Sequence, residues 1–220
     1  MNEPPRRDTY AGYRTRLVEA VRATGIRDLT VLHAVADVPR HLFVPVALRG
    51  QAYEDTSLPI GNGQTISAPS THARAIEALR LTGREKVLEV GTGSGYQTAL
   101  LGLTASHVFS IERVGALANR ARQALAEAGV KNVSVLVGDG TLGWRAYAPY
   151  DAILVAAASP DVPAPLLEQL APGGRLLLPL GTPEAQVLTL VAIDADGVQT
   201  RSAVSGARFV PLRGTHGFDG

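Results

Sequence analysis

Short apolar strands alternate with helical segments from residue 83 onward, and this alternation constrains the fold more than any other feature of the chain. Five runs rich in Val, Ile and Leu are expected as strands: Lys86–Val90, Val108–Glu112, Val133–Val137, Ala152–Ala157 and Arg175–Leu180. Helical patterns accompany them at Tyr96–Leu103, Val114–Ala128 and Pro163–Leu170. Strands that are apolar throughout and separated by helices are typical of a parallel sheet covered on both faces. The sequence therefore predicts an open α/β sheet.

Two further strands are expected near the C-terminus. Val187–Ile193 and Val198–Val204 flank the turn Asp194–Gly197, a pattern typical of a hairpin. The mostly parallel sheet should therefore end in antiparallel strands. A chain of 220 residues suits one domain, 1–220. Within it we expect a helical and loop region at 1–82, a ligand-binding core at 83–181, and final strands and a tail at 182–220.

Helices and loops are expected before the sheet. Asp8–Ala23 has an amphipathic helical pattern that Asp8 can cap, and Leu29–Ala36 reads as a second, shorter helix. Val38–Pro45 is bounded by prolines and should be extended or turning. The polar stretch Leu58–Ser70, LPIGNGQTISAPS, is poor material for the interior of a helix or strand. A helix from Pro69 to about Leu81 follows it.

Composition excludes several classes of function. The chain has 21 basic and 20 acidic residues, a net charge of +1, so no nucleic-acid partner is expected. It has no cysteine, which removes disulfides, thiolate metal sites and cysteine nucleophiles. The first ten residues contain no apolar signal segment, and no apolar run is long enough to span a membrane. We therefore expect a cytoplasmic protein with no membrane partner.

A glycine-rich turn follows the first strand of the sheet, in VLEVGTGSGY. Its loop residues Gly91, Thr92, Gly93 and Gly95 would let the backbone turn tightly and approach a ligand closely. Tyr96 stands where a dinucleotide fingerprint has its third glycine, which disfavours a nicotinamide dehydrogenase. Glu89 would repel a pyrophosphate, but it suits a ligand that carries an ammonium and a sulfonium.

Acidic residues also close the next two strands. A carboxylate at Glu112 can accept hydrogen bonds from both hydroxyls of a ribose, and Asp139, beside Gly140, can accept from an adenine amino group. Each has a structural alternative: Glu112 as a solvated charge at a strand end, and Asp139 as a turn residue. With the glycine turn, these residues lie at successive carboxyl ends of strands, where open parallel sheets bind ligands. The ligand they describe is S-adenosylmethionine, with no metal.

The methyl acceptor is expected to be a carboxylate. Enzymes that methylate amide-like or ring nitrogens commonly carry an Asn/Asp-Pro-Pro-aromatic motif after the fourth strand, where this chain has Val155–Pro160 without such a group. A carboxylate is already ionised at neutral pH and needs no general base. Catalysis then requires alignment and exclusion of water, hence neutral hydrogen-bond donors and a movable loop.

The stretch Leu58–Ser70 supplies such donors. Ser67 is the best single hydroxyl for holding a carboxylate, and its alternative role is to cap the helix that begins at Ala68–Pro69. One serine can do both. Thr65 is expected to support the loop more than to touch the substrate.

These segments resemble the protein-L-isoaspartate O-methyltransferase family over nearly the whole chain. The specific part is Gly63–Ser67, GQTIS, because the glycine loop 89–96 is shared by many methyltransferases. The other matching segments are 38–40, 43–45, 52–53, 55, 58–61, 69, 138–140, 148–153, 169–170, 173–176 and 208–212. The resemblance implies a Rossmann-like fold and a reaction that repairs damaged proteins. The methyl group would go to the free carboxyl of L-isoaspartyl residues, and similar enzymes also accept D-aspartyl residues; the ester then cyclises to a succinimide.

The resemblance also implies roles for single residues. Ser67 matches the proposed active-site serine, and His72 matches a position near the cofactor, although His72 alone could equally be a helix-surface residue. Substrate-binding positions would be Ile60, Gly61, Gln64, Thr65 and Ile66, and Arg213 to Thr215 in the tail match more weakly. The cofactor product would be S-adenosylhomocysteine, the partners damaged proteins, and the enzyme a monomer.

Two other functions fit parts of the same evidence. Another S-adenosylmethionine enzyme could act on a small molecule or on RNA, and RNA would call for a basic surface stripe with aromatic residues. A non-catalytic nucleotide-binding module is the other alternative, against which the presence of Glu89, Glu112 and Ser67 argues.

Overall fold

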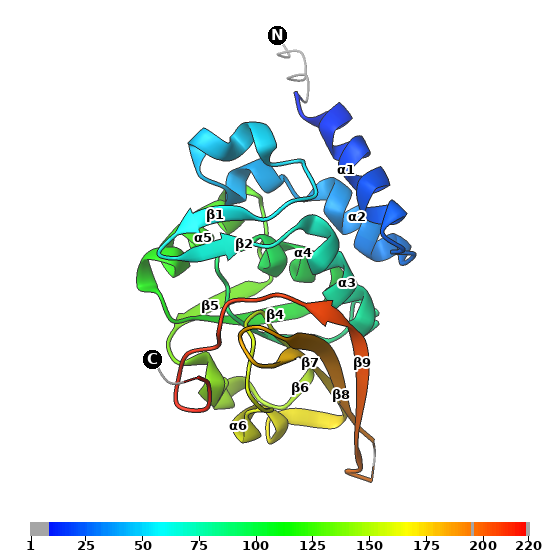
Figure 1. The fold of residues 1–220 in the computed structure, drawn as a ribbon, viewed down its shortest axis with the longest axis vertical. Coiled ribbons are helices and arrows are strands. Elements are labelled where there is room, and N and C mark those ends of the chain that lie inside the picture. Colours follow the sequence, from blue (N-terminus) through cyan, green and yellow to red (C-terminus); the bar gives the residue numbers. More distant parts are fainter. Residues whose placement is uncertain (1–8, 195, 219–220) are drawn as a thin grey trace.

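A computed structural model describes residues 9–194 and 196–218, and its centre is a seven-stranded sheet (Figure 1). The strand order is β5-β4-β3-β6-β7-β8-β9. The parallel strands are β3 (Lys86–Val90), β4 (His107–Glu112), β5 (Val133–Val137), β6 (Tyr150–Val155) and β7 (Leu170–Gly181). The antiparallel strands β8 (Gln186–Ile193) and β9 (Gln199–Ala207) follow β7. The predicted mostly parallel sheet with an antiparallel end is confirmed.

The strand order reverses at β3, and this reversal positions the functional site. From β3 the chain runs outward through β4 to β5, and it then crosses back to place β6 on the other side of β3. Loops that leave neighbouring strands in opposite directions open a crevice at the carboxyl ends of those strands. The glycine loop after β3, the acidic end of β4 and the end of β6 all meet at that crevice.

Helices cover the two faces of the sheet unequally. One face packs against α3 (Pro69–Leu79), α4 (Tyr96–Thr104) and α5 (Gly115–Glu127), with α1 (Ala11–Ala23) and α2 (Leu29–Asp37) behind them (Figure 1). The other face packs against the short α6 (Ala164–Leu167), two 3-10 turns, Gly140–Leu142 and Arg145–Tyr147, and the tail residues Val210 and Leu212. Within the described part of the chain, every helix is too short or too polar to cross a bilayer.

Most predicted elements match the observed ones to within a few residues. The expected helix at 163–170 is instead a single turn, because β7 already begins at Leu170. The segment 38–45 is a 3-10 helix, η1 (Arg40–Phe43), followed by η2 (Val46–Gln51). The proposed cap Asp8 lies outside the described residues, and α1 begins at Ala11.

The stretch 58–70 contains strands, which the sequence interpretation had excluded. Leu58–Gly61 (β1) and Gln64–Ile66 (β2) pair in an antiparallel hairpin. Its turn is Asn62-Gly63, and both residues have positive φ, 54° and 68°. An Asn-Gly pair at such a turn is the strongest short signal for a hairpin, so the strands were predictable. Leu58, Ile60 and Ile66 bury their side chains and anchor the hairpin to the core.

A buried arginine holds the chain around this hairpin. Arg40 is 0% exposed, and its guanidinium donates to the carbonyls of Ala52, Thr56 and Ser67 at 2.7, 2.9 and 3.1 Å. It also lies over the ring of the buried Tyr96, at 5.5 Å from the centroid. Burial lowers the pKa of Arg40, but a guanidinium remains charged in a protein. One side chain thereby joins η1, the segment before β1 and the residue after β2.

We expect Arg40→Met to lower the free energy of unfolding by about 3 kcal/mol or more, because several buried carbonyls lose their donor at once. Arg40→Lys should be intermediate, since an ammonium cannot reproduce the planar set of donors. Urea unfolding at neutral pH measures both changes. The matched control is Arg22→Met at an exposed position of α1, which should change stability by less than about 0.5 kcal/mol. Equal effects of the two methionine variants would contradict this role.

Candidate active site

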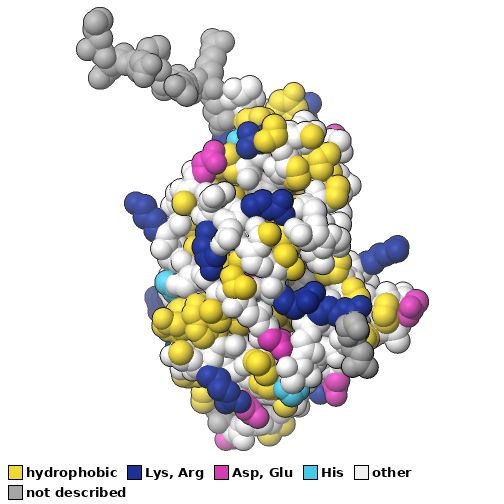
Figure 2. Space-filling model, turned by 90° about the vertical axis from the view of Figure 1, so that its left-hand side faces the viewer, with side chains coloured by type: hydrophobic (Ala, Val, Ile, Leu, Met, Phe, Trp, Pro, Cys, Tyr) yellow, Lys and Arg dark blue, Asp and Glu magenta, His cyan; other side chains and the backbone are white. Residues whose placement is uncertain are grey.

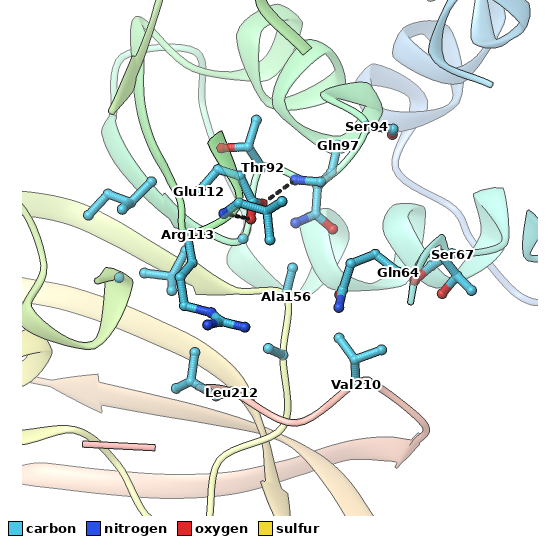
Figure 3. A pocket seen from close by; sticks show the side chains of 18 of the residues that line it. Gln64, Ser67, Thr92, Ser94, Gln97, Glu112, Arg113, Ala156, Val210 and Leu212 are labelled. Atoms are coloured by element: carbon cyan, nitrogen blue, oxygen red, sulfur yellow. Dashed lines mark hydrogen bonds between the residues drawn. The ribbon is translucent and has the colours of Figure 1, made fainter. Parts of the chain in front are cut away.

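A cavity lies at the carboxyl ends of β3, β4 and β6, and it measures about 870 Å³ when the open solvent at its mouth is included. It is lined by residues 64–67, 72, 90–94, 97, 111–114, 140, 156–157 and 210–213. Figure 3 shows Glu112 and Arg113 on one side of this cavity and Gln64 and Ser67 on the opposite side. The sheet edge and the β1–β2 hairpin therefore face each other across a shared space.

Three glycines that line the cavity occupy positions where the backbone conformation or a close neighbour leaves no room for a side chain. Gly91 and Gly93 have φ of 97° and 55°, which side chains other than glycine rarely adopt. Gly140 lies so close to β3 that an added Cβ would be 2.4 Å from a methyl carbon of Val90. Gly95 does not line the cavity; it has φ of 89° at the start of α4, where a Cβ would press on Ala121.

Glu112 is fixed at the cavity by backbone donors. Its Oε2 accepts from Gly93 N and its Oε1 from Val114 N, both at 2.8 Å, and the side chain is 7% exposed. Each carboxylate oxygen has a second lone pair, so both oxygens can still accept a hydrogen bond from a ligand. This arrangement suits two neighbouring hydroxyls and does not suit a solvated strand-end charge.

Glu89 lies beneath the cavity and does not line it. The side chain is 0% exposed, and its carboxylate accepts from Thr98, Ser110 and Gln97 at 2.5, 2.6 and 3.1 Å. Burial raises the pKa of Glu89 to about 7, although these three hydrogen bonds oppose the rise. The structure therefore places Glu89 too deep for the direct ligand contact that the sequence suggested.

His72 reaches the cavity from α3. Its Nδ1 lies 2.7 Å from Oε1 of Gln97, and its Nε2 is buried with no hydrogen-bond partner among the described residues. Burial lowers the pKa of His72 to about 4, so the ring is neutral at physiological pH. The alternative of a helix-surface histidine does not hold, because the side chain is 7% exposed.

Asp139 is bound by the C-terminal tail. Its Oδ2 accepts from the backbone and the hydroxyl of Thr215, at 2.8 and 2.9 Å, and its Oδ1 accepts from Thr141. Burial acts to raise the pKa of Asp139, but these hydrogen bonds outweigh it and hold the pKa below its usual value. Asp139 does not line the cavity, and it fastens the segment that carries Leu212 and Arg213 across the cavity.

Of the two strands of the β1–β2 hairpin, only β2 and the residue after it line the cavity. Gln64, Thr65, Ile66 and Ser67 line the cavity, whereas Ile60 and Gly61 do not; the carbonyl of Ile60 accepts from Arg120 instead. Ser67 is not the helix cap: Ala68 holds that position without a side-chain bond, and Asp55 accepts from Ser70 N. The Ser67 hydroxyl has no partner among the described residues and is available to a ligand.

Several lining residues were missed from the sequence. Gln97 is a polar side chain buried in the first turn of α4, two residues after Gly95 of the glycine loop, and that position was its signal. Arg113 follows Glu112 directly, and Val210 and Leu212 close the lower side of the cavity (Figure 3). The tail returns to this edge because Ala158 exchanges backbone hydrogen bonds with Val210 and Leu212, and because Asp139 binds Thr215.

Comparison with known proteins identifies the family. The family model of protein-L-isoaspartate(D-aspartate) O-methyltransferase matches residues 13–217. The chain belongs to this family. It is 50% identical over 216 residues to the protein-L-isoaspartate O-methyltransferase of Syntrophus aciditrophicus, covering 97% of this chain and 99% of the relative. It is 55% identical over 203 residues to that of an Anaeromyxobacter species, covering 91% and 96%.

Solved structures agree with this membership. A Plasmodium falciparum protein, described as a candidate protein-L-isoaspartate O-methyltransferase and solved in complex with S-adenosyl-L-homocysteine, superposes with a TM-score of 0.79. It is 25% identical, and the match covers 91% of this chain and 98% of that one. The predicted resemblance and the Rossmann-like methyltransferase fold are confirmed.

The raised pKa of Glu89 should appear in the pH dependence of stability. Between pH 4.5 and about 7 the unfolded chain loses a proton that folded Glu89 keeps, so the free energy of unfolding falls as pH rises through this window. Relative to Glu89→Gln, wild type should lose about 3 kcal/mol between these values. The lowered pKa of His72 acts in the opposite sense from about pH 4 to 6.5, but both proteins share it.

Urea unfolding of wild type and Glu89→Gln across this range measures the difference. Glu127→Gln, at the exposed end of α5, is the matched control and should follow wild type at every pH. A stability difference between wild type and Glu89→Gln that is independent of pH would contradict the raised pKa.

Proposed function

We propose that this family member transfers a methyl group from S-adenosylmethionine to the free carboxylate of L-isoaspartyl residues in damaged proteins, with Ser67 holding that carboxylate. The observation that carries the proposal is one cavity with the fixed carboxylate of Glu112 on one side and the unpaired hydroxyl of Ser67 on the other. The methyl ester then cyclises to a succinimide without help from the enzyme, and the succinimide partly reopens to normal aspartate.

The residues present fit the cofactor. Glu112 would hold the ribose hydroxyls with its two free lone pairs, and the backbone at Gly91 and Gly93 would let the cofactor lie directly on the loop. Gly140 would line the adenine side, and the unpaired Nε2 of His72 offers an acceptor for an ammonium. When bound, S-adenosylmethionine supplies an electrophilic methyl group on a sulfonium.

The substrate side of the cavity is neutral. Gln64, Thr65, Ile66 and Ser67 provide amide, hydroxyl and backbone groups without a charged side chain. A carboxylate needs no general base at neutral pH, so these residues only have to orient it and shield it from water. A strong ion pair with the substrate carboxylate would stabilise its negative charge and make the carboxylate a weaker nucleophile. Neutral hydrogen-bond donors do this to a smaller extent.

The face of the molecule drawn in Figure 2 gives no support to RNA as the substrate. Figure 2 shows Lys and Arg side chains spread over one face among hydrophobic and uncharged groups, without a continuous stripe. We therefore propose protein segments as the partners. We also propose that the enzyme works as a monomer.

Radiolabelled methyl transfer to paired peptides tests this function. The two peptides differ only in an aspartyl or an isoaspartyl linkage, and we expect label in the isoaspartyl peptide alone. Equal labelling of both peptides, or of neither, would overturn the proposal. A D-aspartyl peptide in the same assay decides the second substrate in the family's name.

Ser67→Ala should lower turnover by about tenfold or more, because one hydrogen bond to a charged group is lost, while cofactor affinity stays near that of wild type. Steady-state kinetics and calorimetric titration with S-adenosylhomocysteine separate the two quantities. Ser57→Ala, at an exposed position before the hairpin, is the control. Normal turnover at saturating substrate would mean that Ser67 does not hold the carboxylate.

Glu112→Gln should do the reverse. The amide nitrogen would face a backbone N–H of Gly93 or Val114 and could no longer accept from the ligand, so cofactor affinity should fall by about 10- to 100-fold. Turnover at saturating cofactor should remain close to wild type. Unchanged affinity in the calorimetric titration would exclude Glu112 from the cofactor site.

A further inference from the structure

Two chains of hydrogen bonds run from the cavity to the buried Glu89. One leads from His72 through Gln97 to Oε1 of Glu89, over distances of 2.7 and 3.1 Å. The other leads from Thr92 through Ser110 to Oε2, over 2.5 and 2.6 Å. His72 and Thr92 both line the cavity, and Glu89 does not.

The carboxylate sets the direction of every bond in these chains. An ionised Glu89 only accepts, so Gln97 must turn its NH2 group toward Glu89 and its carbonyl oxygen toward His72. Nδ1 of His72 must then carry the proton, which leaves a bare lone pair on Nε2. In the other chain Ser110 donates to Glu89, so Thr92 donates to Ser110 and keeps oxygen lone pairs free.

We propose that Gln97 is a positioning residue that transmits the fixed polarity of Glu89 to His72, so that Nε2 of His72 presents an acceptor to the ammonium of the cofactor. This inference rests on the proposed function. Glu89 thus acts on the cofactor without touching the cofactor. It acts through the hydrogen-bond chain that contains Gln97 and through the one that contains Thr92.

The competing arrangement has the proton on Nε2. The carbonyl of Ser67 acts to raise the pKa of His72 against the lowering by burial, so it is the acceptor that a proton on Nε2 would have to use. That carbonyl already accepts from Arg40, and Nε2 makes no hydrogen bond with it. A proton on Nε2 would also require Nδ1 to accept from Gln97, which would turn the carbonyl of Gln97 against the carboxylate.

Nitrogen NMR of the imidazole rings in ligand-free protein decides between the two tautomers. At about pH 8, His72 is neutral and Glu89 is mostly ionised. The protein has five histidines, so the His72 signals are assigned by their loss in His72→Gln. We expect the proton on Nδ1 in wild type. A proton on Nε2 in wild type would overturn the proposal without any variant.

The Gln97→Met variant removes both the NH2 donor and the oxygen acceptor of the side-chain amide, and it keeps the side-chain volume nearly constant. We expect His72 to shift toward the Nε2-protonated tautomer, which free histidine prefers. Gln123→Met makes the same change on the exposed side of α5 and should leave the His72 signals as in wild type. His72 signals that are identical in Gln97→Met and wild type would overturn the role of Gln97.

Ligand titration connects the tautomer to binding. S-adenosylhomocysteine carries the ammonium, and methylthioadenosine lacks it together with the carboxylate of the amino-acid end. Gln97→Met should weaken S-adenosylhomocysteine by about tenfold and leave methylthioadenosine unchanged. Equal weakening of both ligands would indicate general distortion and contradict the proposal. If wild type binds neither ligand, the proposed function fails, and the tautomer measurement still decides the polarity of the chain.

Discussion

The guanidinium of Arg40 is the interaction on which the site depends. It is fully buried, and its two terminal nitrogens donate to backbone carbonyls before β1 and after β2 instead of to a carboxylate, whereas its Nε has no partner among the described residues. A buried cation without an ion pair is unfavourable unless its donors are satisfied, so the surrounding carbonyls must stay in place. The last of these carbonyls belongs to Ser67, which lines the cavity and whose hydroxyl has no partner among the described residues. The hydrogen bonds of Arg40 thereby fix the backbone at Ser67 and leave the neutral Ser67 hydroxyl available at the cavity.

The two carboxylates on the cofactor side are placed at different depths. Glu89 lies under the floor and acts through neutral side chains, whereas Glu112 reaches the cavity because backbone N–H groups hold both of its oxygens. The C-terminal tail closes the remaining side, since Asp139 binds Thr215. In the proposed function, a carboxylate substrate would meet hydroxyl and amide groups, and a cationic cofactor would meet acceptors. This division suits methyl transfer between an anion and a sulfonium, which needs alignment and dryness more than proton transfer.

The sheet and the cofactor edge could be predicted because each rests on local pattern. Apolar strands such as 86–90, the glycine turn and Glu112 at a strand end fix the crevice without knowledge of distant contacts. The β1–β2 hairpin was not predicted, although the pair Asn62-Gly63 is a sequence signal for a hairpin turn. The roles of Glu89 and Asp139 could not be read from the sequence, because the depth of Glu89 depends on Gln97 and Thr98 in α4, and Asp139 is bound by a segment from the other end of the chain. Arg40 has four carbonyl partners between residues 52 and 67, all distant from it in the sequence, which no local pattern reveals.

A crystal structure with S-adenosylhomocysteine and an isoaspartyl peptide tests the central claim most directly. We expect the free carboxylate of the peptide within hydrogen-bond distance of the Ser67 hydroxyl, the ribose on Glu112, and Arg40 still bound to the carbonyl of Ser67. A peptide carboxylate held instead by Arg113 or Arg213, with Ser67 turned away from it, would contradict the claim.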